Sequence, residues 1–278
     1  MTDTPFRFFD VHVVRTERIS PSLMRVTFGG DRLPEIVTGG RDQRFKLFLP
    51  HPGQEMPVLP ENLGEDWFAD WRAQDPSVRA FMRTYTVRDL RRDPAELDVD
   101  FALHGDPDGS GGHSGPASSW ARAARPGDRL TLLAPVVEDN GGVDFQPPAG
   151  TDWALVTADE TALPALAGIL AWLPAGMPVK VWAEIGHADD VQDLPTAADA
   201  EITWLVRGAA HEAPVLDSVR AAELPEGTPY AWIAGESGTV KALRRHLVGE
   251  RGFDRRAVTF TGYWRRGASE EDLLAELA

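Results

Sequence analysis

The chain has 278 residues, a length that fits either one large domain or two of about 140 residues. Hydrophobic residues make up 42% and charged residues 26%, as in an ordinary globular protein, and the absence of cysteine excludes disulfides, iron–sulfur clusters and cysteine nucleophiles. The net charge of −15 would repel nucleic acid and anionic membranes over most of the surface, so we expect neither as a partner.

The amino-terminal residues do not resemble a signal peptide. Asp3, Arg7, Asp10 and His12 interrupt the apolar residues there, so the basic start and the unbroken apolar run are both missing. No stretch approaches the roughly 18 apolar residues that a membrane span needs. Because a chain without cysteine also suits a reducing compartment, we predict a soluble, cytoplasmic protein.

The first half of the chain has the pattern of β structure. Short apolar runs bounded by Gly, Pro and Asp predict strands at 6–15, 23–29, 45–49, 83–88, 97–104 and 129–134. Strands at this spacing favour an antiparallel β-barrel, with one helix at 116–124 that has proline at its first position. Residues 51–80 are less regular. Helices are expected there at 67–72 and 76–82, and the role of this segment stays open.

Turn-forming residues at 139–142 and 147–150 indicate a junction, so we predict two domains, 1–147 and 148–278. After the junction the pattern changes to alternating strands and helices. Strands are expected at 153–158, 179–185, 202–206, 230–234 and 257–263, and helices at 162–173, 215–222 and 238–250. This order predicts an α/β domain with a parallel sheet covered on both faces. Residues 270–277 form a short acidic amphipathic tail.

The run Arg83-Thr84-Tyr85-Thr86-Val87-Arg88 can offer several ligand contacts from one strand. Alternation in a strand places Arg83, Tyr85 and Val87 on one side and Thr84, Thr86 and Arg88 on the other. The strand therefore offers a guanidinium for a phosphate, an aromatic ring for stacking and a hydroxyl for a ring nitrogen. A surface strand with alternating polar residues is the alternative.

A glycine-rich stretch follows His104 and runs into Gly115-Pro116-Ala117-Ser118-Ser119-Trp120. A loop of this kind before a helix presents backbone N–H groups and the positive end of the helix dipole, which suits a pyrophosphate. Ser118 and Ser119 would add hydroxyl donors. From the pattern alone, a plain loop and a structural His104 remain alternatives.

In the second half, residues 158–164 join the first strand to its helix, the position where α/β sheets bind ligands. The glycine fingerprint of dinucleotide sites is absent there. Residues 235–238 occupy a later turn of the same kind and lead into Lys241, Arg244 and Arg245. These basic residues suit a nucleotide edge or a solvated helix face. No metal-ligand spacing and no hydrolase nucleophile elbow is present.

Taken together and in order, these segments resemble the siderophore-interacting protein family, which belongs to the ferredoxin-reductase-like flavoproteins. The resemblance covers nearly the whole chain, from residues 83–88 and 100–105 through 115–121, 125–128, 159–164 and 231–236 to 243–247 and 262–265. It implies an FAD-binding barrel followed by an α/β domain that resembles NAD(P)H-binding domains.

The resemblance also implies roles for individual residues. Tyr85 would pack on the isoalloxazine, Arg83 would meet the pyrophosphate, and Thr86, near N5, would be the residue with catalytic influence. The implied FAD contacts are Arg83, Tyr85, Thr86, Val87, His104, Ala117, Ser118, Trp120, Asp159, Thr161 and Ala162. Ala117, Ser118 and Trp120 would take the phosphates and the adenine side.

The implied reaction is the reduction of a ferric siderophore by FAD. Lys46, Arg265 and Arg266 would bind the siderophore, and the net charge favours a weakly charged hydroxamate complex. NADPH, NADH or reduced ferredoxin would donate the electrons, and Arg207, Lys241, Arg244 and Arg245 would favour the 2′-phosphate of NADPH. No metal site belongs to the protein itself. Two alternatives are a general NAD(P)H-flavin or quinone oxidoreductase, and a non-catalytic siderophore-binding protein.

Overall fold

The computed structural model describes residues 4–61, 64, 66–105, 114–208 and 214–268, and the chain divides into two compact units. The first unit comprises the chain up to Ile19, together with Met24–Gly39 and Gln43–Val143. The second comprises Ser20–Leu23, Gly40–Asp42 and the chain from Asp144 onwards. Within the described ranges, no helix is long and apolar enough to cross a membrane.

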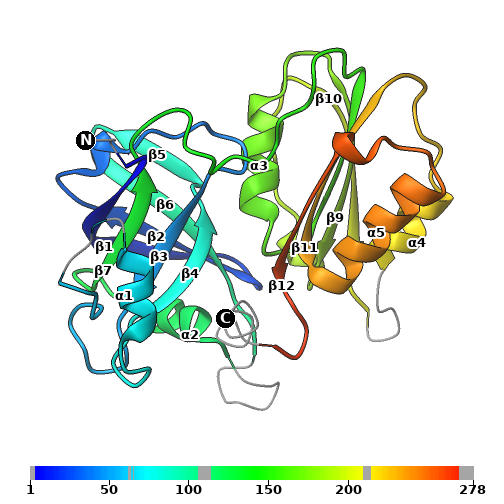
Figure 1. Ribbon diagram of the computed structural model, residues 1–278. Coiled ribbons are helices and arrows are strands. Elements are labelled where there is room, and N and C mark those ends of the chain that lie inside the picture. The colour runs from blue at the N-terminus through cyan, green and yellow to red at the C-terminus, as the bar shows by residue number, and fades with distance from the viewer. Residues whose placement is uncertain (1–3, 62–63, 65, 106–113, 209–213, 269–278) are drawn as a thin grey trace. The chain divides into compact units, whose positions relative to one another are not determined.

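The first unit is an antiparallel sheet that forms a half-barrel, in line with the antiparallel β-barrel that the strand spacing predicts (Figure 1). Its strands are ordered β4-β3-β7-β1-β2-β6-β5. Their bounds are β1 (Phe6–Ser20), β2 (Leu23–Gly29), β3 (Arg44–Leu49), β4 (Phe81–Thr86), β5 (Asp89–Arg92), β6 (Ala95–Ala102) and β7 (Arg129–Pro135). Alternate apolar side chains of these strands, such as Val11, Phe45 and Leu132, form one buried core. Helix α2 (Pro116–Ala123) contacts β3, β4 and β6.

The irregular segment between β3 and β4 packs on the sheet through its aromatic residues. Helix α1 (Trp67–Ala73) places the ring of Trp67 5.5 Å from Phe8 and 5.8 Å from Phe48. The prediction of a helix at 76–82 is wrong, because the chain turns there and then enters β4. Asp75 accepts hydrogen bonds from the backbone of Ser77 and Arg79 in a tight turn, and Arg79 then pairs with Val58 immediately before β4 begins.

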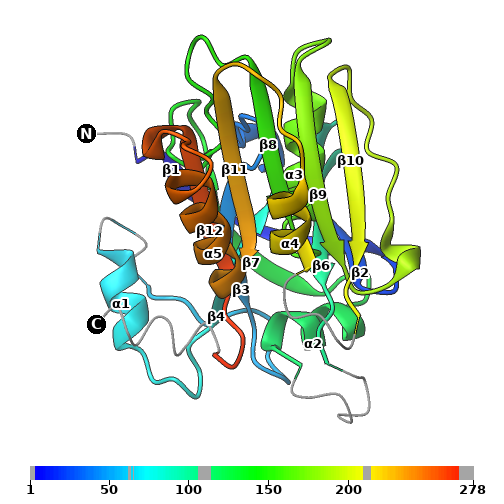
Figure 2. The ribbon, with the colours of Figure 1, turned by 90° about the vertical axis from the view of Figure 1, so that its right-hand side faces the viewer.

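The second unit is a five-stranded parallel sheet in the order β10-β9-β8-β11-β12. Helix α3 covers one face of the sheet, and α4 and α5 cover the other (Figures 1 and 2). The elements are β8 (Trp153–Ala158), α3 (Leu163–Trp172), β9 (Pro178–Ile185), β10 (Asp199–Val206), α4 (Pro214–Ala221), β11 (Pro229–Glu236), α5 (Ser237–Gly249) and β12 (Val258–Trp264). All six residues of β8 are buried, as expected for the central strand of a sheet covered on both faces. This confirms the predicted ferredoxin-reductase-like order of a β-sheet unit and an α/β unit.

Two buried carboxylates explain why two short segments from the first half belong to the second unit. Asp190 accepts hydrogen bonds from the hydroxyls of Ser20 and Ser22 at 2.7 Å each. Asp42, itself in Gly40–Asp42, accepts hydrogen bonds from Trp232 Nε1 at 2.9 Å and from the backbone of Phe145 at 3.1 Å. Each carboxylate thus satisfies several donors that would otherwise be buried without partners.

Candidate functional site

Strand β4 carries the side chains that the resemblance assigns to the flavin. Arg83 and Tyr85 lie on one face of the strand, opposite Leu47 and Phe45 of β3. The ring of Tyr85 lies 4.5 Å from that of Phe101, which leaves Tyr85 half-buried and held in place. Thr86 is buried and lies on the other face by strand alternation. Since β4 is at the end of the sheet order, a flat ligand along its edge can meet side chains from both faces.

Val87 follows β4 and is nearly buried, and its backbone N–H donates to the carbonyl of Gln43 at 2.9 Å. The Arg83 guanidinium donates to the Met82 carbonyl at 2.9 Å. The guanidinium carbon of Arg83 also lies 5.9 Å from the centre of the Phe81 ring. The row of half-buried side chains on β4 is therefore anchored by the strand and its neighbours, which favours a preorganised binding face.

The start of α2 provides a site for an anion. Gly115 precedes the helix with no side-chain cap, and a Cβ placed on it would meet nothing within 4 Å. The hydroxyl of Ser114 is buried without a hydrogen-bond partner among the described residues. First-turn N–H groups of a helix have no intrahelical partner and favour negative charge. An orphaned donor beside an open helix start fits the pyrophosphate of FAD. The glycine-rich residues 106–113 lie outside the described ranges.

The end of β6 is fastened to α2 through Ser118. The Ser118 hydroxyl accepts a hydrogen bond from His104 N at 3.0 Å, and Arg122 donates to the Gly105 carbonyl at 2.9 Å. The Ser118 side chain is thus engaged by the backbone, so any phosphate contact of this residue would come from its N–H group. Ala117 is nearly buried beside it.

Trp120 belongs to the same neighbourhood. Its ring lies 6.2 Å from Phe28 and 5.8 Å from Phe101, and Phe101 also contacts Tyr85. The structure therefore joins the predicted residues of β4 and α2 through one shared aromatic ring. These two elements carry the residues that the resemblance assigns to FAD within the first unit, apart from Val87, directly after β4, and His104, two residues after β6.

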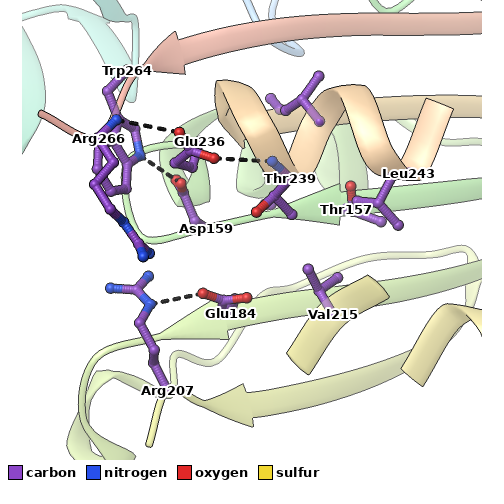
Figure 3. A pocket seen from close by; sticks show the side chains of 13 residues that line it. Thr157, Asp159, Glu184, Arg207, Val215, Glu236, Thr239, Leu243, Trp264 and Arg266 are labelled. Atoms are coloured by element: carbon purple, nitrogen blue, oxygen red, sulfur yellow. Dashed lines mark hydrogen bonds and ion pairs between the residues drawn. The ribbon is translucent and has the colours of Figure 1, made fainter. Parts of the chain in front are cut away.

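The second unit has a hollow at the carboxyl ends of its strands (Figure 3). Asp159 lies there just beyond β8 and accepts hydrogen bonds from the Thr161 backbone at 2.9 Å and from Trp264 Nε1 at 2.7 Å. Burial, reinforced by the neighbouring Glu160 carboxylate, raises the pKa of Asp159 to about 6. Ala162 is fully buried at the start of α3. Asp159, Thr161 and Ala162 thus lie in one turn, and the Asp159 carboxyl in this turn has a raised pKa.

Arg207 joins two of the strand ends around the hollow. Its guanidinium donates to Glu184 at 2.7 Å and to both oxygens of Glu160 at 2.6 and 3.0 Å. Glu160 and Glu184 are 5% and 8% exposed, so both nearly buried carboxylates depend on this one cation as their counter-charge, and the three residues together keep a net negative charge. Arg207 follows β10, Glu184 ends β9 and Glu160 follows β8.

Glu236 occupies the start of α5 (Figure 3). Its carboxylate accepts hydrogen bonds from the backbone of Gly238 at 2.6 Å, of Thr239 at 2.9 Å and of Arg266 at 3.2 Å. Burial opposes ionisation of this carboxyl, but the three backbone donors outweigh burial and lower its pKa. A negative charge of the protein therefore already fills this helix terminus.

The three predicted siderophore contacts are divided between the units. Lys46 of β3 belongs to the first unit and donates to the Thr84 hydroxyl at 2.7 Å. Arg265 and Arg266 belong to the second unit, where Arg265 pairs with Ala268 across a short turn and Arg266 lines the hollow.

Sequence reasoning missed Glu184, the cap formed by Glu236 and the bond between Trp264 and Asp159. The sequence could have indicated Glu184, because an acid at the carboxyl end of the second parallel strand is typical of nucleotide sites. The acid directly before the predicted helix at 238–250 also indicates a cap. The pairing of Trp264 with Asp159 had no local signal, since 105 residues separate the two.

Comparison with known proteins shows which family the chain belongs to. Residues 12–139 match the model of the siderophore-interacting FAD-binding domain, and residues 151–267 match that of the siderophore-interacting protein. Ferric vibriobactin reductase ViuB of Vibrio cholerae is 32% identical over 93% of this chain and 89% of its own length. The NADPH-dependent ferric-chelate reductase of Escherichia coli is 31% identical over 93% of each chain.

Solved structures agree with these matches. The siderophore-interacting protein SipS of Aeromonas hydrophila is 33% identical with a TM-score of 0.77, over 98% of this chain and 96% of that one. A siderophore utilization protein of T. fusca is 33% identical with a TM-score of 0.79, over 95% of each chain. The ferredoxin reductase of carbazole 1,9a-dioxygenase, at 17% identity over 95% of this chain and 71% of its own, shares the fold with a TM-score of 0.63. With relatives of this identity along nearly its whole length, the chain belongs to the siderophore-interacting protein family.

Proposed function

We propose that this protein is an FAD-dependent ferric-siderophore reductase that takes its electrons from a nicotinamide nucleotide. The observation that carries the proposal is the open, uncapped start of α2 beside the half-buried row of Arg83 and Tyr85, found in the unit that matches the FAD-binding family model. The relatives named ferric vibriobactin reductase and NADPH-dependent ferric-chelate reductase support the substrate and the donor class.

In this proposal the first unit holds FAD. Tyr85 supports the flavin ring, because its own ring is fixed against Phe101. Arg83 and the first-turn N–H groups at Ala117 and Ser118 neutralise the pyrophosphate. Val87, His104 and Trp120 line the cofactor, and the buried hydroxyl of Thr86 adjusts the flavin's reactive edge. In the second unit, Asp159, Thr161 and Ala162 border the site of the donor.

Bound FAD would supply the conversion of a two-electron hydride donor into single electrons for Fe(III). The side chains then have binding and positioning to perform, and no general acid or base is required of them. The candidate cations for attracting the ferric complex are Lys46 in the first unit and Arg265 and Arg266 in the second. Release of iron follows because siderophores bind Fe(II) far more weakly than Fe(III).

Anaerobic visible spectroscopy of the purified protein tests the proposal. We expect flavin bands that bleach when a nicotinamide nucleotide is added and return as a ferric siderophore is reduced, with Fe(II) captured by a ferrous chelator. Thr86→Ala should keep FAD and lose most of the rate of flavin reduction. A colourless protein that does not take up FAD would overturn the proposal, and so would a reducible flavin that transfers no electrons to ferric complexes.

Two finer points belong to the same proposal. Reduced ferredoxin remains a second donor to compare in the spectroscopic experiment, by its rate of flavin reduction. A cytoplasmic location is proposed from the cysteine-free composition, and fractionation of cells would test it.

A further inference from the structure

The charges around the hollow of the second unit decide which nicotinamide nucleotide suits it. We propose that this hollow discriminates against a 2′-phosphate, so that the donor of this protein is NADH rather than NADPH. The inference rests on the proposed function, because it takes a nicotinamide nucleotide to bind at the carboxyl ends of the parallel strands.

The first step concerns the residue types that distinguish the two nucleotides. In parallel α/β sheets an acid near the end of the second strand binds the ribose 2′-hydroxyl of NAD, whereas a nearby arginine accommodates the 2′-phosphate of NADP. This chain has both residue types, Glu184 at the end of β9 and Arg207 after β10. The Nε atom of Arg207 lies 2.7 Å from Oε1 of Glu184. Their partners therefore decide which of them can serve a ligand.

Arg207 is already committed to two carboxylates. It holds Glu184 and, through two nitrogens, both oxygens of Glu160. A 2′-phosphate could recruit this guanidinium only by leaving one or both nearly buried carboxylates without their counter-charge, which is strongly unfavourable. The three residues together carry a net negative charge, so the cation of this cluster does not attract a phosphate.

The helix in front of the hollow adds no free phosphate site. Glu236 fills the start of α5 with its own carboxylate, which binds the N–H groups of Gly238 and Thr239. Among the described residues that line the hollow, three carboxylates (Asp159, Glu184 and Glu236) stand against the guanidiniums of Arg207 and Arg266. An additional phosphate dianion would enter a field that is already negative.

The other basic residues of the second unit lie elsewhere. Lys241, Arg244 and Arg245 recur at helical spacing on α5 and line a separate hollow with Phe260. The Arg244 guanidinium carbon lies 4.5 Å from the centre of the Phe260 ring. None of these three cations lines the hollow at the strand ends. The sequence-based expectation that they and Arg207 favour NADPH therefore loses its structural support.

Calorimetric titration of the FAD-loaded protein with NAD⁺ and with NADP⁺ tests the inference without turnover. We expect NAD⁺ to bind at least about tenfold more tightly, a factor that corresponds to ~1.4 kcal/mol. Equal affinity, tighter binding of NADP⁺, or no binding of either nucleotide would overturn it. Reduction of the flavin by dithionite, followed by addition of a ferric siderophore, tests the reductase proposal separately, so the two failures are distinguishable.

Removal of one carboxylate sharpens the test. Glu184→Gln keeps the shape of the side chain but releases part of Arg207, so NADP⁺ should bind about threefold to tenfold more tightly relative to NAD⁺. Glu201→Gln is the matched control, because Glu201 pairs with Lys180 on the same two strands but is exposed. An NAD⁺/NADP⁺ ratio that stays the same in Glu184→Gln, or that shifts equally in the control, would contradict the role of Glu184.

Discussion

The two units each present a helix start to a candidate phosphate site, and the two starts differ in what occupies them. Gly115 opens α2 with no side-chain cap, and a Cβ placed on it would meet nothing within 4 Å. Glu236 opens α5 with a carboxylate that accepts hydrogen bonds from two first-turn N–H groups. Helix dipoles favour an anion at both positions. In one unit the ligand can supply that anion, and in the other the protein supplies it.

The difference shows that a strand-to-helix turn in a parallel sheet is not by itself a phosphate site. The position of the turn follows from the fold, whereas its use depends on which charges the chain places there. Near α5 the hollow contains acidic side chains, and Arg207 forms ion pairs with Glu160 and Glu184 that offset the cost of burying their charges. Around α2 the described residues offer donors without a competing carboxylate.

The largest effect on stability is expected from removing Arg207, the cation that pairs with the acids at the hollow of the second unit. Arg207→Gln should lower the free energy of unfolding by about 3 kcal/mol, because Glu160 and Glu184 would be left buried without a counter-charge. Urea unfolding measures this change. Lys180→Gln, which breaks the exposed pair with Glu201, should cost no more than about 1 kcal/mol. An equal loss of unfolding free energy in the two variants would show that Glu160 and Glu184 do not need Arg207 as their counter-charge.

A pH dependence of intermediate size should come from Asp159. Its pKa is about 6 in the folded protein because of burial and the adjacent Glu160, against about 4 in an unfolded chain. The folded state therefore prefers the protonated form. This contribution to stability is complete below pH ~4 and is lost as the pH rises through about 6, by on the order of 2 kcal/mol. Urea unfolding of Asp159→Asn should lack that fall, and pH profiles that stay parallel in the variant and the wild type would contradict it.

The smallest effect should come from closing the open helix start. Gly115→Asp would give α2 the kind of cap that Glu236 gives α5, so the free energy of unfolding should rise by roughly a few tenths of a kcal/mol. FAD should nevertheless bind about tenfold more weakly, since a carboxylate would occupy the place of the pyrophosphate. Flavin fluorescence measures the affinity. Gly115→Ala is the matched control, and equal FAD affinity in the two variants would refute the comparison of the helix starts.

Local pattern predicted most of the secondary structure. The run 153–158 was expected as a strand and is β8 within the same bounds, because six consecutive apolar or small residues between turns suit a fully buried strand. Strand β5 was not predicted. Its residues Asp89–Arg92 contain one apolar side chain, and the strand is stabilised by the pairing of Arg91 with Asp98 and Glu96 of β6. Such cross-strand ion pairs are visible only when the sheet is formed.

The sequence by itself determined the order of the elements, the alternation of residues on β4 and the glycine and proline that open α2. These depend on backbone periods and on neighbours within a few residues. The tertiary structure alone decided which charges meet. Arg207 reaches acids 23 and 47 residues away, and Trp264 reaches an acid 105 residues away. The carboxyl ends of parallel strands converge only in the folded sheet, so the charge of the hollow there depends on contacts that no local pattern contains.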